Sequence, residues 1–286
     1  MTPELIADYE CVVGEGPMWH PLEKRLYWGD ILTGRLFRYD PVSRKHEQIY
    51  CGDVVGGFTV QADGALLLFG EKGRIRIWRE GALTTVVDEI PADRDTRFND
   101  VIADPEGRVF CGTMPVKDRP ASLYRLDPDG TLTKVLDDVG LSNGMGFTPD
   151  LRQIYYSDTA KMMISLFDYD RGNGALSNQR VFARVPRGEG APDGMTVDAE
   201  GYVWSARWGG GVLVRYAPDG QIVDRVAFPA LKVSSAMFGG DDYGDLYVTT
   251  AGGDQKATDG AGAGALFRLR PGVKGRPEFL SRVGIA

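Results

Sequence analysis

Four oxygen-bearing side chains stand at equivalent positions in the sequence, each ten or eleven residues before a short apolar segment. They are Glu15, Asn99, Asn143 and Asp193. Two carboxylates and two amide carbonyls, with no thiolate or imidazole among them, form the donor set that hard cations such as Ca²⁺, Mg²⁺ and Mn²⁺ prefer. Zn²⁺ and Fe²⁺ also accept such oxygens, so the sequence predicts a divalent-cation site and leaves the ion open.

These positions also have a second interpretation, as turns. Asn-Gly and Asp-Gly pairs are frequent turn formers, and both Asn143 and Asp193 directly precede a glycine. Because all four residues share one phase relative to the apolar segments, we favour a common site over unrelated turns.

Histidine is scarce, with His20 and His46 the two in 286 residues. The segment 140–144 matches the G-x-S-x-G pattern around Ser142, but a serine hydrolase of that type needs its catalytic histidine after the serine, and both histidines precede it. We expect His20 to be a hydrogen-bonded residue at a strand end. Carboxylate and amide oxygens are therefore left to hold any metal.

The apolar segments belong to a repeat that positions these side chains. Successive segments start 40, 43, 45, 49 and 43 residues apart, at Leu26, Leu66, Val109, Ile154, Val203 and Leu246. Each follows a turn of the Asp/Glu-Gly or Pro-Asp type, and other short apolar runs follow it. In the fifth unit the predicted strands are Gly194–Val197, Tyr202–Arg207, Val212–Tyr216 and Ile222–Ala227.

A four-stranded antiparallel unit repeated about every 40–50 residues is typical of a β-propeller blade. We therefore predict an all-β fold, a single six-bladed propeller domain spanning residues 1–286, with Gly252–Gly264 as a long loop in the last blade. The first strand of each blade lines the central channel, so residues at its start gather at one mouth. In the second and sixth units, the positions ten or eleven residues before the apolar segment are Val55–Gly56 and Ser235. Trp19 and Trp208 are candidates for the wall of such a site or for the core.

Composition narrows the partners and the compartment. Lys and Arg number 33 against 40 Asp and Glu, a net charge of −7 without a basic run, which argues against nucleic acid. No apolar run approaches the roughly 20 residues of a membrane helix and the start lacks a signal-peptide pattern, so we expect a cytoplasmic protein without membrane contact. The three cysteines are expected to be buried free thiols. A closed ring leaves no sheet edge unpaired, which favours a monomer or a weak homo-oligomer.

Several motifs together resemble the gluconolactonase/regucalcin (senescence marker protein) family. They are GEGPxW near Glu15, RFND at residues 97–100, SNGxGFxPD around Asn143, PDGMxVDxEG around Asp193 and a late FGG. The resemblance implies a six-bladed propeller with one divalent metal ion in its channel, and hydrolysis of sugar lactones. It also implies that Glu15, Asn143 and Asp193 are metal ligands, with Asp193 also the catalytic base, and that Arg97 and Asn99 contact the substrate.

The sequence departs from this family pattern at Lys117. Some members have a substrate-binding glutamate three residues after the methionine that corresponds to Met114, and here that position is a lysine. We therefore expect metal-dependent opening of an aldonolactone to its aldonic acid, with Ca²⁺, Zn²⁺, Mn²⁺ or Fe²⁺ as the cofactor and an unknown sugar preference. The alternatives are phosphotriester hydrolysis in the same site and a non-enzymatic cation-binding role.

Overall fold

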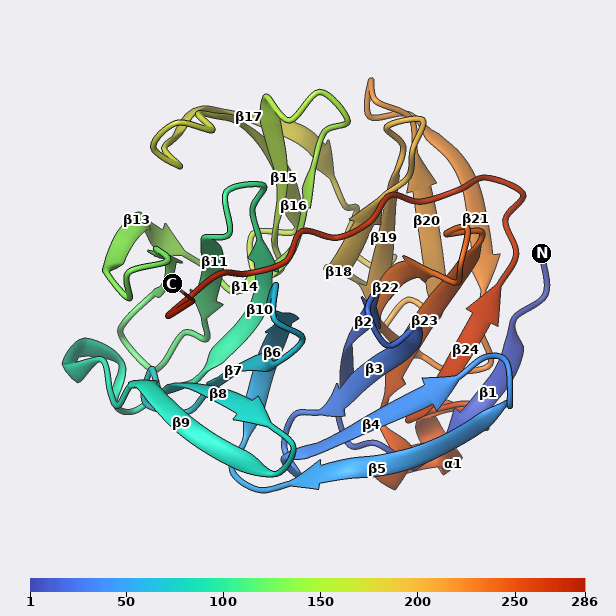
Figure 1. Cartoon of the computed structure of the whole chain (residues 1–286). Helices are drawn as coiled ribbons and strands as arrows, with labels where there is room; N and C mark the ends of the chain where they lie inside the picture. The colour runs from blue at the N-terminus through green and yellow to red at the C-terminus, as the bar shows by residue number, and fades with distance from the viewer. Residues whose placement is uncertain (286) are drawn as a thin grey trace.

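The computed structural model describes residues 1–285 and shows six four-stranded antiparallel sheets arranged in a ring (Figure 1). This confirms the predicted six-bladed β-propeller. The six apolar segments that define the repeat are the second strands of the six sheets. They are buried because both faces of each sheet are covered by neighbouring sheets, which is why they are nearly continuous runs of apolar residues.

The first three sheets follow the chain from the inner to the outer strand. The first consists of β2 (Gly14–His20), β3 (Arg25–Asp30), β4 (Arg35–Asp40) and β5 (Lys45–Cys51). The second consists of β6 (Val55–Val60), β7 (Leu66–Gly70), β8 (Ile75–Arg79) and β9 (Ala82–Val87). The third follows a 3-10 turn, η1 (Pro91–Asp93), and consists of β10 (Phe98–Ala103), β11 (Val109–Thr113), β12 (Ala121–Leu126) and β13 (Leu132–Val139).

The next two sheets repeat this order. The fourth consists of β14 (Ser142–Phe147), β15 (Gln153–Asp158), β16 (Met163–Tyr169) and β17 (Leu176–Arg184). The fifth consists of β18 (Ala191–Val197), β19 (Val203–Trp208), β20 (Val212–Tyr216) and β21 (Ile222–Ala227), within a few residues of the predicted strands.

The sixth sheet closes the ring by combining both ends of the chain. Its inner strands are β22 (Lys232–Gly239), β23 (Asp245–Ala251) and β24 (Ala265–Leu269), and its outer strand is β1 (Glu4–Asp8), which pairs antiparallel with β24. The predicted loop Gly252–Gly264 joins β23 to β24 and contains the short helices η2 (Gly253–Gln255) and α1 (Lys256–Asp259). That an N-terminal strand completes the last blade was not predicted from the sequence.

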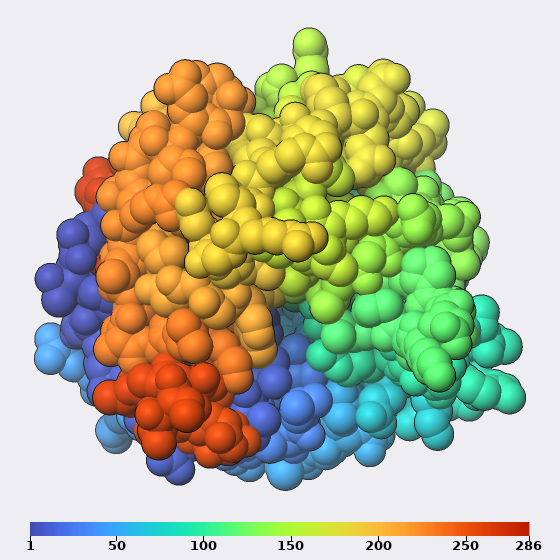
Figure 2. All heavy atoms as spheres, turned by 180° about the vertical axis from the view of Figure 1, so that it is seen from behind, coloured from blue at the N-terminus to red at the C-terminus, as the bar shows by residue number. Residues whose placement is uncertain are grey.

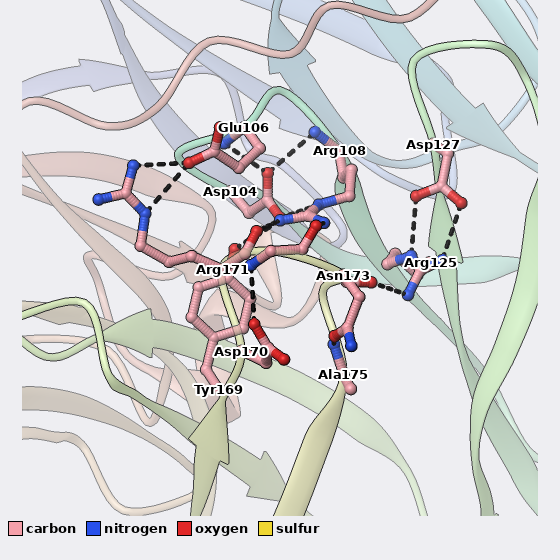
Figure 3. Close-up of polar contacts among 11 residues, drawn as sticks. Asp104, Glu106, Arg108, Arg125, Asp127, Tyr169, Asp170, Arg171, Asn173 and Ala175 are labelled. Carbon is pink, nitrogen blue, oxygen red and sulfur yellow. Dashed lines mark hydrogen bonds and ion pairs between the residues drawn. The ribbon is translucent and has the colours of Figure 1, made fainter.

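A buried polar network ties the third sheet to the fourth (Figure 3). Asp104, in the turn after β10, accepts hydrogen bonds from the backbone amides of Glu106 and Arg108 at 2.9 and 3.0 Å. Its other oxygen accepts from Arg108 Nε at 2.5 Å and from the Tyr169 hydroxyl at 2.7 Å. Arg108 also donates to the backbone carbonyl of Arg171, in the turn after β16. All the lone pairs that this buried carboxylate offers are thus used.

Residues 270–285, which we call the C-terminal strap, cross one face of the ring (Figure 1). The strap is hydrogen-bonded to the second, third, fifth and sixth sheets through the pairs Gly275 N with Tyr243 O, Ala199 N with Lys274 O, Ser281 N with Val60 O, Arg282 N with Gly107 O, and Gly284 N with Pro128 O. Its Phe279 lies edge-on to Phe147 of β14. The strap therefore covers the end of the channel at which the inner strands finish.

The cysteines correct one prediction. Cys11 and Cys111 are buried, as expected, but Cys51 is exposed because it ends the outer strand β5, which has no neighbour on one side. Among the described residues no helix is long and apolar enough to cross a membrane.

Candidate functional site

The inner strands share a β-bulge near their first residues. In β14 the pairing with β15 shifts between Ser142 and Met145, so that Asn143 and Gly144 lie opposite one residue. All six inner strands show a shift at the equivalent place. Three of the four predicted ligand-type residues lie inside these bulges and the fourth directly precedes one: Asn99, Asn143 and Asp193, and Glu15. A bulge re-aims a side chain, which explains how strand residues point along the channel.

Glycines after two of these residues let the inner strands approach one another. A Cβ at Gly144 would lie 2.5 Å from the backbone nitrogen of Met195 in β18, and one at Gly194 would lie 2.2 Å from Ser235 Oγ in β22. Both glycines lie inside strands and neither has a positive φ. The Asn-Gly and Asp-Gly pairs are therefore not turns, and their glycines serve close packing around the axis.

All five predicted site residues line one cavity of about 220 Å³ on the face opposite the strap. They are Glu15, Arg97, Asn99, Asn143 and Asp193. Figure 2 shows this face, with a central hollow between the blue first sheet, the green third and fourth sheets and the orange later sheets. The structure thus brings together residues that lie as much as 178 positions apart in the chain.

The two carboxylates are buried without a cationic partner. Glu15 is 5% exposed and Asp193 is 4% exposed, and neither forms an ion pair with any described lysine, arginine or histidine. Burial raises the pKa of Glu15 well above its ordinary value, and the negative charges of Asp100 and Asp193 raise it further. Burial and the charge of Asp100 raise the pKa of Asp193 in the same way, against an opposing effect of Asn143, Arg207 and Arg97.

Asn143 presents a free acceptor to this cavity. Its Nδ2 donates to Thr159 Oγ1 at 3.0 Å, and that hydroxyl donates to the backbone carbonyl of Pro192 at 2.7 Å. These two bonds fix the plane of the amide. Its Oδ1 is buried and has no hydrogen-bond partner among the described residues, which is costly for a polar atom unless a ligand satisfies it.

Arg97 and Asn99 form a second polar unit beside the carboxylates. Arg97 Nη1 donates to Asn99 Oδ1 and to the carbonyl of Phe98, both at 2.8 Å, and Asn99 Nδ2 donates to the carbonyl of Ser142 at 2.9 Å. Burial lowers the pKa of Arg97, while the charges of Glu15 and Asp100 act in the opposite direction. Within residues 1–285, Nε and Nη2 of Arg97 donate to no protein group, so they are available to a ligand.

The donor set fits a divalent cation of the hard class. Two carboxylates short of partners and one orphaned amide oxygen meet in a cavity without thiolate or imidazole. No group of three or more His, Cys, Asp or Glu side chains is arranged for a metal among the described residues. That is consistent with a set in which the third donor is an amide.

Thr159 and most of the cavity wall were not predicted from the sequence. The wall consists of Val13, Ile31, Leu32, Met114, Leu141 and Trp208. Of the two candidate tryptophans, Trp208 lines the cavity, whereas Trp19 packs in the core between the first and sixth sheets. Lys117 is exposed on the loop after β11 and does not line the cavity.

Two other predictions are confirmed by position. Ser142 lies in β14 and is followed by further strand, so the G-x-S-x-G match is not a nucleophile elbow. His20 is 1% exposed, and its Nε2 lies 3.1 Å from the carbonyl of Gly64 at the strap end of β2, away from the cavity.

By fold and site, this protein is a closed β-propeller with carboxylate and amide side chains gathered at one mouth of its central channel. The family model of the SMP-30/Gluconolactonase/LRE-like region matches residues 13–252, and the chain belongs to this family. The chain is similar to pentonolactonase XacC of Haloferax volcanii, 48% identical with 99% of each chain covered. It is also similar to regucalcin of Danio rerio, 37% identical with 94% of this chain and 97% of the relative covered.

Solved structures of relatives share the whole fold. A regucalcin from Agrobacterium tumefaciens, described as a calcium-binding protein, superposes with a TM-score of 0.90 at 27% identity, covering 99% of this chain and 98% of that one. A luciferin-regenerating enzyme superposes with a TM-score of 0.89 at 28% identity, covering 98% of this chain and 100% of that one.

Proposed function

We propose that this protein is a metal-dependent sugar lactonase that opens an aldonolactone to its aldonic acid. Membership of the SMP-30/Gluconolactonase/LRE-like family and the 48% identity to a pentonolactonase support this activity. The observation that supports the metal dependence is the buried Oδ1 of Asn143, which has no hydrogen-bond partner within residues 1–285 and lies in the same cavity as two carboxylates without a cationic partner there. Glu15, Asn143 and Asp193 would hold the ion.

A divalent cation bound there would polarise the lactone carbonyl and make an adjacent water molecule a stronger acid. The protein's own groups do the rest. Arg97 has free donors toward the cavity, so it would hold the lactone by its ring oxygen or hydroxyl groups and orient the carbonyl. Asn99 is fixed by Arg97 and by the carbonyl of Ser142, and would contact the same substrate.

Asp193 is the proposed general base. It would accept a proton from the attacking water while the water oxygen bonds to the carbonyl carbon, and it would return that proton to the ring oxygen when the ring opens. Because burial and Asp100 raise the pKa of Asp193, the ionised base depends on nearby positive charge. Arg97 and Arg207 supply part of that charge, and a cation at the site would supply more.

The size of the cavity fits a small substrate. About 220 Å³ is less than the roughly 300–1,000 Å³ of pockets for drug-sized ligands, so a compact lactone of five or six carbons suits it better than an oligosaccharide. The pentonolactonase relative favours five-carbon sugars as the first substrates to test.

The test is a panel of pentono- and hexonolactones assayed with and without a chelator. We expect turnover that the chelator abolishes. Equal rates in both conditions would refute the metal dependence, faster turnover of a phosphotriester would favour phosphotriester hydrolysis, and turnover of neither substrate class would favour a cation-binding protein without enzymatic activity.

A further inference from the structure

The floor of the cavity is polar, and its mouth is mostly apolar. The floor consists of inner-strand residues that are almost completely buried, namely Glu15, Asn99, Asn143 and Asp193. The mouth is formed by the ends of other strands and the loops after them. Leu32, in the loop after β3, is 53% exposed there, and Met114, Leu141 and Trp208 are half-buried around it.

The mouth offers few polar partners. Thr159 is its uncharged polar residue, and the hydroxyl already accepts from Asn143 Nδ2 and donates to the carbonyl of Pro192. Among the side chains that line the cavity, Arg97 through Nε and Nη2 and Trp208 through its indole N–H have donors that bond to no other described residue. A substrate whose distal part carries several hydroxyl groups would place some of them against aliphatic side chains without hydrogen-bond partners, which costs binding energy.

The apolar side chains at the mouth together form one concave surface. A single exposed leucine is ordinary on a protein surface, but here Leu32 shares one concavity with several other apolar side chains. Trp208 also contacts a lysine that does not line the cavity. The Lys232 ammonium lies 5.5 Å from its ring centroid and is itself 2.7 Å from Asp259 Oδ2.

We infer that this site also hydrolyses γ-lactones that carry a short alkyl chain on the ring carbon next to the ring oxygen. This rests on the proposed function, because the same floor would bind the lactone group. The lactone lies on the carboxylate and amide floor, and the alkyl chain lies against Leu32, Met114 and Trp208 at the mouth.

The reaction needs water and no other reactant. The water oxygen bonds to the carbonyl carbon, and the bond between that carbon and the ring oxygen breaks. The ring oxygen receives the proton removed from water and becomes the hydroxyl group of a 4-hydroxy acid, whose carboxyl group loses its own proton at neutral pH.

The experiment measures kcat/KM for a pentono-1,4-lactone and for γ-valerolactone, γ-hexalactone and γ-octalactone in parallel. We expect kcat/KM of the alkyl series to rise by roughly two- to fourfold for each added methylene group, which is the effect of burying that group. Leu32→Asn should lower the ratio of γ-octalactone to pentonolactone activity at least fivefold.

The matched control is Leu22→Asn. Leu22 is 61% exposed in the turn at the opposite end of β3, outside the cavity, so this variant should leave that ratio unchanged. A flat or falling alkyl series beside normal pentonolactone turnover would overturn this inference and leave the proposed sugar lactonase intact. Turnover of the alkyl series without turnover of any sugar lactone would uphold the inference and refute the proposed sugar substrate. Absence of turnover with every lactone would refute both.

Discussion

Buried carboxylates occur in two settings in this propeller. In the turns near the strap, Asp104 and Asp198 are fully buried, and each is saturated with hydrogen bonds from backbone amides and from an arginine. At the other mouth of the channel, Glu15 accepts a bond from the amide of Gly16, and neither it nor Asp193 is paired with a described arginine or lysine. Figure 3 shows the saturated arrangement around Asp104.

We infer the roles of the two sets of carboxylates from this difference. A buried charge without partners destabilises the folded state, and this fold can evidently supply partners where a carboxylate serves structure. The cavity carboxylates lack them although Arg97 lies in the same cavity, where it is bonded to Asn99 instead. We interpret the strap-side carboxylates as structural and the cavity carboxylates as held ready for a cation and a substrate.

Asp193→Asn, which changes a cavity carboxylate, should lower activity strongly without lowering stability. It removes the proposed base and one charged ligand, so we expect kcat/KM for pentonolactone to fall by about 10²–10⁴-fold. It also removes a buried charge that raises the pKa of Glu15, so the metal-free protein should unfold at an equal or higher temperature. Steady-state kinetics and thermal unfolding check this, and wild-type activity in the variant would exclude Asp193 as base.

Asp104→Asn should show the reverse pattern. It leaves the Arg108 guanidinium buried without its carboxylate, which typically costs about 3–5 kcal/mol of unfolding free energy. Activity per folded molecule should stay close to that of the wild type, because Asp104 lies at the strap side of the third sheet. Denaturant unfolding measures the loss, and an unchanged unfolding midpoint would contradict the structural interpretation.

Thr159→Val tests how the Asn143 amide is oriented. Valine keeps the shape but removes the hydroxyl that accepts from Asn143 Nδ2, so the amide can rotate and present its oxygen less well. We expect affinity for Ca²⁺ or Mn²⁺ to fall by about 10–100-fold, as when other groups that orient metal ligands are removed. Calorimetric titration of chelator-treated protein measures this, and Thr159→Ser should restore affinity. Equal affinities in all three proteins would show that the hydroxyl has no such role.

The smallest expected effect concerns Glu278 of the strap. Burial raises its pKa to about 7, with an opposing effect of the Arg276 charge. Because the folded-state pKa lies above the unfolded value of about 4.3, its contribution to stability is greatest below about pH 4 and is lost as the pH rises toward and through 7. Glu278→Gln should therefore reduce by a few degrees the fall in unfolding temperature between pH 5 and pH 8. Parallel profiles for the two proteins would contradict this pH dependence.

The sequence predicted the floor of the site better than its wall. The repeat fixes the phase of the inner strands, so Glu15, Asn99, Asn143 and Asp193 were found by counting back from apolar anchors. The bulge at that point is what turns their side chains into the channel, and it occurs in all six sheets.

The wall was not predicted, because the apolar residues that form it have no side-chain chemistry that marks a site. Four wall residues do share a phase of their own, since Ile31, Met114, Thr159 and Trp208 each lie five residues after the first residue of an apolar segment. Leu32 lies one residue further on, in the loop between β3 and β4. The pairing of β1 with β24 was also missed, because it joins segments about 260 residues apart and no local pattern marks it.

Metal content tests the central claim most directly. Elemental analysis of the purified wild-type protein and of Asn143→Ala, after identical exposure to the same divalent ion and removal of excess, should give one ion per wild-type chain and almost none per variant chain. Lactone turnover should fall in proportion. Equal metal content in the two proteins, or full lactone turnover by wild-type protein without metal, would contradict the account.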